Sequence, residues 1–363
     1  MISIKSKKLP LYEVITKEFL KARIAENLNQ HEIAEYIRKT NGGTCSQATV
    51  NGYFKKFGLS PDRVTSKLQR GIDIEEVREQ YQLLKPYEFT EPIKRIDRET
   101  TDFFYEDLVL LISDLQIGAL DTDDGFDPVP EETVANYVDT MLTNLLEYIN
   151  DEDVRVKNMH IFLLGDIVDG EFVYPAQKTI NMSSQLRTAI RMVMRIVETC
   201  KTFADNVHLY SVHGNHGRVS FKSHRVTNWD NAVADALNII YEYDPKVHFI
   251  LENHDTVKIV KIGKWRYLYS HGHLIQGMVD RNKLKAKTQD WYFSIGEFDA
   301  SLFGHWHTVH LFDINGKPAL VNGCAYKSEY IRKQIGGIET LGMVLFRPNE
   351  NRPIDNIRLL EVE

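Results

Sequence analysis

The chain has 363 residues, of which 43% are hydrophobic and 26% are charged, and its formal net charge at pH 7 is −7. This ordinary globular composition excludes a disordered chain, a fibrous protein and a uniformly basic nucleic-acid binder. Three cysteines that lie far apart, Cys45, Cys200 and Cys324, exclude a disulfide-rich secreted scaffold and favour a reducing compartment.

The first 70 residues form a basic segment on an otherwise acidic chain. They contain 13 Lys or Arg and 6 Asp or Glu, a local charge of +7, so the remainder carries −14. Apolar residues recur at helical spacing over 14–39, with a helix start at Asn29 inside this stretch. A second helix is expected to be capped by Ser46 and to end at Gly58. Residues 1–70 are therefore predicted to form a small all-α basic domain.

The order of these helices resembles that of helix-turn-helix domains. The residues that carry the resemblance are Gln30, Glu32, Ile33, Ala34, Ser46, Thr49 and Val50. It implies DNA as a partner, and the candidate contacts on the second helix are Gln47, Asn51, Lys55 and Lys56. A helical bundle for protein contacts is the alternative interpretation.

Residues 71–106 are interpreted as a connector, because Pro86, Pro92 and alternating charges favour an extended segment. From 107 to 363, short apolar runs alternate with amphipathic helices. The expected helices are 131–149, 183–203, 229–241 and 277–290. The expected strands are 108–113, 160–164, 207–212, 257–262, 266–270, 301–303, 309–314, 319–321, 342–346 and 357–361. This alternation predicts an α/β domain over 107–363, with sheet strands buried on both faces.

Polar residues recur where the expected strands end. Twelve of the 13 histidines lie between His160 and His310, and several of them follow a strand directly. The residues that follow five successive strands are Asp114 and Gln116, Asp166 and Asp169, Asn215 and His216, His271 and His273, and His305 and His307. Because sites in open α/β sheets form at the carboxyl ends of strands, we expect these side chains to converge. Imidazole, carboxylate and amide groups together predict a site for Zn, Mn or Fe.

The order and spacing of these residues, from Asp114 to His307, resemble the calcineurin-like metallophosphoesterases. That family's pattern is Asp-x-His, Gly-Asp-x-x-Asp, Gly-Asn-His, His and Gly-His-x-His. The resemblance implies a β-sandwich core flanked by helices, an α+β sandwich, with two divalent metal ions at one sheet edge. The implied metal ligands are Asp114, Gln116, Asp166, Asn215, His271, His305 and His307, with Asp166 bridging the two ions. His216 matches the family's proton donor, and Asp169 matches the carboxylate that orients it.

Two positions depart from the family's pattern. Gln116 stands where the family usually has histidine, and an amide oxygen is a poorer ligand for Zn or Fe than imidazole. The cofactors are therefore expected to be Mn²⁺ or Mg²⁺, with Zn²⁺ and Fe as the other candidates. The family usually has an acidic residue directly after Gly-Asn-His, and here Gly217 and Arg218 follow instead. Arg218 is a candidate for binding a substrate phosphate; the alternative is that it forms a surface ion pair. His273 is a second candidate for substrate contact.

These features predict a metal-dependent phosphoesterase that hydrolyses phosphodiester bonds, with DNA as substrate. The site resembles that of DNA-repair exonucleases, and its combination with a helix-turn-helix domain resembles proteins of bacteriophages. Two alternatives stay open: a phosphatase or phosphodiesterase for small molecules or phosphoproteins, and a DNA-binding regulatory protein with a weakened metal site. No apolar run approaches the roughly 20 residues of a membrane span, so we expect no membrane partner and a cytoplasmic location, the host cytoplasm for a phage protein. Oligomeric state stays open.

Overall fold

The computed structural model describes residues 10–25, 28, 30–41, 44–58, 105–119, 131–152, 154–171, 173, 181–220, 222–224, 226–250, 253–325 and 339–362. The chain divides into two compact units, Met1–Lys85 and Pro86–Glu363. Nearly all of the connector that was predicted for 71–106 lies outside the described residues. The domain boundaries at 70 and 107 therefore stay predictions.

The first unit is a small group of helices around one apolar cluster. Its helices are α1 (Leu11–Val14), α2 (Lys17–Ala25), α3 (Gln30–Asn41) and α4 (Gln47–Lys56), so the helical stretch over 14–39 is divided between α2 and α3. The buried cluster consists of Ile15, Leu20, Ile33, Ala34, Ile37, Cys45, Val50 and Phe54. Helices α2, α3 and α4 each contribute apolar residues to this cluster, and the opposite face of α4 is exposed.

The cap that was predicted for α4 is confirmed. Ser46 is extended, and its hydroxyl accepts a hydrogen bond from the amide of Thr49 at 3.1 Å. Beyond the last turn, Gly58 adopts a φ of +64°, which suits a glycine that ends a helix.

Replacing Ser46 by alanine should destabilise the first unit by about 1 kcal/mol, because the Thr49 amide loses its acceptor. Thermal unfolding of the full chain, followed in the first unit by amide exchange, measures this loss. Gln47→Ala is the matched control, because Gln47 is the exposed neighbour of Ser46 and alanine is favourable in a helix. Equal stability of the two variants would show that the cap contributes nothing.

The second unit contains two mixed sheets. The six-stranded sheet has the order β11-β10-β1-β2-β3-β4, and the five-stranded sheet has the order β5-β6-β7-β9-β8. The strands of the first sheet are β1 (Tyr105–Ile112), β2 (Arg155–Leu163), β3 (Ala204–Ser211), β4 (Val247–Phe249), β10 (Gly342–Arg347) and β11 (Asp355–Glu361). Those of the second are β5 (Val257–Ile262), β6 (Trp265–Ser270), β7 (Ala300–Phe303), β8 (His310–Ile314) and β9 (Lys317–Val321). Strands β1 to β4 are parallel to one another, as are β6, β7 and β9.

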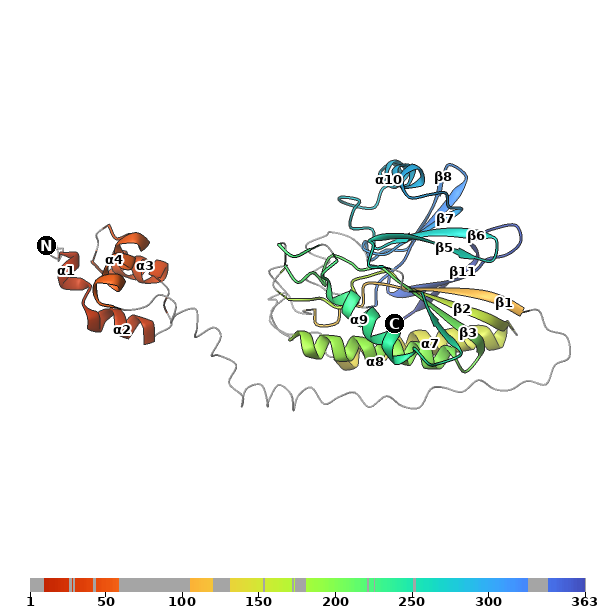
Figure 1. The fold of residues 1–363 in the computed structure, drawn as a ribbon, viewed down its shortest axis with the longest axis horizontal. Helices are drawn as coiled ribbons and strands as arrows, with labels where there is room; N and C mark the ends of the chain where they lie inside the picture. The colour runs from red at the N-terminus through yellow and green to blue at the C-terminus, as the bar shows by residue number, and fades with distance from the viewer. Residues whose placement is uncertain are drawn as a thin grey trace, which may run out of the picture. The chain divides into compact units, whose positions relative to one another are not determined.

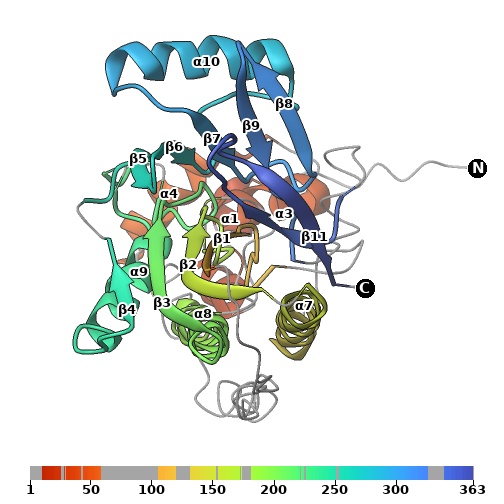
Figure 2. The same ribbon diagram turned by 90° about the vertical axis from the view of Figure 1, so that its right-hand side faces the viewer.

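Helices cover the outer faces of the two sheets. Figures 1 and 2 show α7 (Glu131–Asp151) and α8 (Met182–Cys200) against the six-stranded sheet and α10 (Arg281–Ser294) over the five-stranded sheet. Helix α9 (Trp229–Ile240) follows β3. Separate apolar clusters fill the space between α7, α8 and the first sheet, the space between the sheets, and the space under α10. The second unit is therefore an α/β sandwich in which the two sheets pack face to face.

Several elements differ from the sequence prediction. Strands β1 and β2 begin at Tyr105 and Arg155 rather than at 108 and 160, and α8 ends at Cys200 rather than at 203. Strand β4 was missed because its three residues are too few to show a period. Helix α10 was predicted to begin at 277 but begins at Arg281, since the Asp280 carboxylate caps it by accepting hydrogen bonds from the amides of Asn282 and Lys283. Gly277, with a φ of +80°, belongs to the preceding turn.

The carboxyl ends of β1, β2, β3, β6 and β7 meet at one edge of the sandwich, and side chains tie the two sheets together there. His271 after β6 is hydrogen-bonded through Nδ1 to the Leu164 carbonyl at 2.7 Å. The Ser113 hydroxyl donates to the Gly323 carbonyl at 3.2 Å. This edge therefore brings together the loops that carry the predicted ligands. Within the described residues, no helix has the length and apolar character needed to cross a bilayer.

Candidate metal centre

Most of the predicted ligands have an unusual backbone conformation. Seven non-glycine residues in the described parts of the chain have positive φ. Five of them are predicted ligands: Asp114, Gln116, Asp166, His305 and His307. For residues with a Cβ, this left-handed region costs of order 1–3 kcal/mol each, and such strain gathers at functional sites. The fold thus maintains strained turns at the strand ends where the polar side chains converge.

The first group of ligands surrounds His307. Its Nε2 atom lies 3.3 Å from Asp114 Oδ1 and 3.1 Å from the Gln116 side-chain nitrogen. Its Nδ1 atom faces the carboxylate of Glu339 at 3.7 Å. This separation is longer than a hydrogen bond, but a carboxylate on the Nδ1 side favours a proton at Nδ1, and Nε2 is then the atom that would face a bound cation. Asp114 Oδ1 is buried and accepts no hydrogen bond from any residue that the structure describes.

The second group surrounds His271, which is fully buried. Its Nε2 atom lies 2.9 Å from Asp166 Oδ2 and 3.2 Å from Asn215 Oδ1, while Nδ1 faces the Leu164 carbonyl. Asp166, His271 and His305 each offer a ligand atom within 4.8 Å of the others. The His305 amide also donates to Asp114 Oδ2 at 2.9 Å, which links the two groups.

The electrostatics of both groups favour a cation. Burial lowers the pKa of His271, but the charge of Asp166 outweighs it and raises that pKa to about 9. For His307, burial is likewise outweighed by Asp114, and the pKa rises to about 10. Buried carboxylates thus create a negative potential at the site, which raises the pKa of both histidines. Carboxylate oxygens, imidazole nitrogens and an amide oxygen are ligand types that divalent metal ions accept, so the residues present fit a metal centre.

A hydrogen-bonded histidine–aspartate pair lies beside these two groups. His216 Nδ1 lies 2.7 Å from Asp169 Oδ1, and the His216 backbone amide donates to Asp166 Oδ1 at 2.8 Å. Burial lowers the pKa of His216, but the charge of Asp166 and the hydrogen bond that His216 donates to Asp169 raise it above the usual value. An imidazolium that a carboxylate orients in this way is a suitable general acid.

The two predicted substrate residues lie close to this centre. The His273 ring is 5.5 Å from that of His271 and 6.3 Å from that of His213, between ring centroids. Arg218 is half-buried and pairs by a single β-bridge with Asn228. Its charge contributes to the lowered pKa of His213, whose main cause is burial. A role in substrate binding stays a prediction for Arg218 and His273.

Two buried carboxylates at the site were not anticipated from the sequence. Glu339 faces His307, and Asp230 at the start of α9 accepts hydrogen bonds from four backbone amides of the site loops. Neither residue follows a strand or belongs to a recognisable motif. The one signal for Asp230 is its position after the helix cap Asn228.

The loops at the centre approach so closely that they need glycine. A Cβ atom on Gly214 would lie 2.0 Å from Asp166 Oδ1, and one on Gly165 would lie 2.5 Å from the Gly214 nitrogen. The glycines of the Gly-Asp and Gly-Asn-His segments are therefore required by the contact between the two loops.

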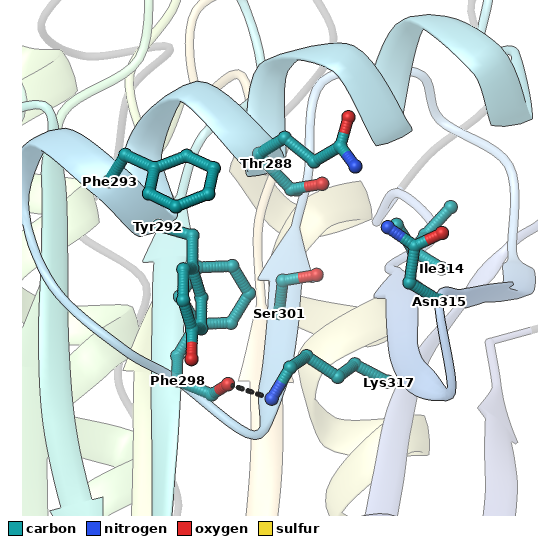
Figure 3. Close-up of a pocket in the computed structure, with 9 residues that line it drawn as sticks. Thr288, Tyr292, Phe293, Phe298, Ser301, Ile314, Asn315 and Lys317 are labelled. Carbon is teal, nitrogen blue, oxygen red and sulfur yellow. Dashed lines mark hydrogen bonds between the residues drawn. The ribbon is translucent and has the colours of Figure 1, made fainter.

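An apolar pocket lies elsewhere in the second unit. It has a volume of about 210 Å³ beneath α10, and its lining includes Tyr292, Phe298, Ser301 and Lys317 (Figure 3). The Lys317 ammonium donates a hydrogen bond to the Phe298 carbonyl at 2.7 Å. No candidate metal ligand lines this pocket, so it is not an alternative location for the metal centre.

Comparisons with known proteins return distantly similar structures but no relative in sequence. No family model matches the chain, and no curated protein matches it. Vps29 from Entamoeba histolytica, solved with Zn²⁺, is 15% identical over 67% of this chain and 87% of its own, with a TM-score of 0.32. An archaeal phosphodiesterase is 12% identical over 69% of this chain and 99% of its own, with a TM-score of 0.34. A predicted phosphoesterase from Streptococcus pneumoniae is 12% identical over 69% and 97%, with a TM-score of 0.29. Similarities this distant do not bear on the activity of this chain.

Proposed function

We propose that the chain is a metal-dependent phosphoesterase that hydrolyses phosphodiester bonds, with DNA as its substrate. The observation that carries the proposal is the position of His216. Its backbone amide binds the carboxylate of Asp166, and its side chain is held by Asp169 at 2.7 Å. A proton donor thus lies beside a cluster of metal-ligand side chains, which is the combination that phosphoester hydrolysis requires.

The proposal includes two divalent metal ions, each held by one of the two groups of candidate ligands. In this proposal Asp114, Gln116 and His307 would hold one ion, Asn215, His271 and His305 would hold the other, and Asp166 would bridge the two. Bound divalent ions, Mn²⁺ in our proposal, supply an activated water and neutralise charge on the phosphoryl oxygens. His216 then gives its Nε2 proton to the leaving alkoxide, and Asp169 keeps the ring in place through Nδ1.

The first unit supports DNA as the substrate, because residues 1–70 have a net charge of +7 whereas the rest of the chain has a net charge of −14. On α4, Gln47, Lys55 and Lys56 are exposed, while Val50 and Phe54 on the opposite face are buried. The two lysines belong to the last turn, and α3 packs against α4. This arrangement supports a helix-turn-helix function in which α4 contacts DNA and raises its local concentration at the metal centre.

Replacing Lys55 and Lys56 together by alanine should weaken DNA binding and flatten its salt dependence. Each phosphate contact contributes about −0.9 to the slope of log K against log [salt], so losing two should reduce the slope by about 2. DNA affinity at several salt concentrations measures this change. The control, Lys17→Ala with Lys21→Ala, removes the same charge from the exposed face of α2. Equal effects of the two pairs would show that α4 has no special role.

Deleting residues 1–70 gives a second measurement of the same proposal. Hydrolysis of a small phosphodiester dye in Mn²⁺ should persist, because every proposed ligand follows residue 113. Cleavage of linear DNA should fall, because the remaining chain carries −14. If the shortened chain binds and cleaves DNA as well as the whole chain does, small molecules or phosphoproteins become the favoured substrates. If neither chain hydrolyses dye or DNA, the phosphoesterase proposal is wrong.

A further inference from the structure

Asp230 lies at the point where two site loops meet. It occupies the first turn of α9, is 5% exposed, and belongs to none of the ligand groups. Its Oδ2 atom accepts hydrogen bonds from the amides of Asp166 at 2.9 Å and Gly214 at 2.8 Å. Its Oδ1 atom accepts from the amides of Ile167 at 3.1 Å and Val168 at 3.3 Å. One buried carboxylate thus serves four amides from the loops after β2 and β3.

The adjoining cap residue strengthens this connection. Asn228 Nδ2 donates to the Gly214 carbonyl at 2.9 Å, and Asn228 Oδ1 accepts from the Asp230 amide at 2.9 Å. The Trp229 amide donates to the Gly217 carbonyl at 2.7 Å. The start of α9 is therefore hydrogen-bonded to both ends of the loop that carries Asn215 and His216. The Asp230 carboxylate also binds the loop that carries Asp166.

We propose that Asp230 is a positioning residue that holds Asp166 and Asn215 in the geometry that binds metal. Asp166 has a φ of +51°, a conformation that the chain must maintain against strain. The amides that Asp230 fixes are those of Asp166 itself, of the two residues after it, and of the residue before Asn215. An ionised Asp230 satisfies all four, because a carboxylate offers about four lone-pair directions. The proposal rests on the metal centre described above and adds a residue that touches neither metal nor substrate.

Asp230→Asn tests this role, because it keeps the size of the side chain and replaces one acceptor oxygen by a donor. In either orientation, the NH₂ group of the asparagine faces two backbone N–H groups. Two hydrogen bonds are then lost, because all of these groups are donors. We expect the affinity of the metal-free protein for Mn²⁺, measured by calorimetry, to fall about 10- to 100-fold, the usual effect of losing such a supporting group. Amide exchange of Ile167 and Val168 in the metal-free protein should become faster. The kcat for the dye should fall more than its KM rises.

Asp235→Asn is the matched control, since Asp235 lies on the same helix with its side chain 49% exposed and paired with His254. Wild-type Mn²⁺ affinity in folded Asp230→Asn would overturn the proposal, as would an equal loss in Asp235→Asn. If Asp230→Asn does not fold, Asn228→Ser replaces it: serine still caps α9 but loses the bond to Gly214. Its affinity should fall by a smaller factor, and wild-type affinity would again overturn the proposal. Failure of the wild-type protein to bind Mn²⁺ would instead refute the metal centre itself.

Discussion

His216→Ala should reduce turnover of phosphodiesters with a poor leaving group by about 10²- to 10⁴-fold, the usual contribution of general acid–base catalysis. The structure gives the reason, because Asp169 holds the imidazole at 2.7 Å and the charge of Asp166 helps to keep it protonated. A nitrophenyl ester needs little help in releasing its leaving group, so its hydrolysis should fall much less. Parallel kinetics on DNA and on the dye measure the difference.

His224→Ala provides the control for this experiment, because His224 is an exposed imidazole close to the same loop. Metal content of both variants should equal that of the wild type, since the His216 backbone amide, which binds Asp166, is unchanged. Equal losses on the two substrates would remove His216 from the role of proton donor. An unchanged rate on DNA would do the same.

Asp166→Asn should weaken binding of both metal ions and reduce activity by more than about 10²-fold. Metal ions contribute several kcal/mol to transition-state stabilisation, and each 1.36 kcal/mol corresponds to a factor of ten. The carboxylate lies 2.9 Å from His271 Nε2 and within 4.8 Å of the ligand atom of His305, so its charge acts on the whole cluster. Metal analysis after reconstitution, together with dye hydrolysis, gives the result.

The matched control is Asp205→Asn, which removes one charge from an exposed position on β3. It should leave both metal content and activity unchanged. If wild-type protein binds at most one ion, the proposal of two ions is wrong. If Asp166→Asn loses only one of two ions, Asp166 belongs to a single ion and does not bridge.

The α/β character of the second unit could be predicted because its central strands, such as β7 and β10, are buried on both faces and appear as short apolar runs. The sandwich itself was expected from the family resemblance. The runs at Leu108–Ile112 and His160–Leu163 both lie within observed strands. Since the polar residues directly follow these runs, their meeting at one edge also follows from the sequence. Strand β4 could not be found in this way, because pairing with β3 rather than a pattern of its own defines it.

The supporting residues of the site could not be predicted for a different reason. Asp230 follows Gly214 by 16 residues and reaches the amide of Asp166 from the start of a helix. Glu339 faces His307 from the segment before β10. A sequence shows which side chains can bind metal, but a carboxylate that binds backbone amides has no motif. Only the tertiary structure reveals such partners.

The ties between the two sheets at the metal edge have a consequence for folding. Asp114, Asp166 and Asn215 lie in loops that follow strands of the first sheet, while His271, His305 and His307 lie in loops that follow strands of the second. Neither half alone contains the full ligand set, so Mn²⁺ affinity should appear only after the sheets have docked. Contacts this distant in sequence form slowly. In a refolding experiment, metal uptake should therefore follow the recovery of helical circular dichroism, and a folding intermediate with one formed sheet lacks part of the candidate ligand set.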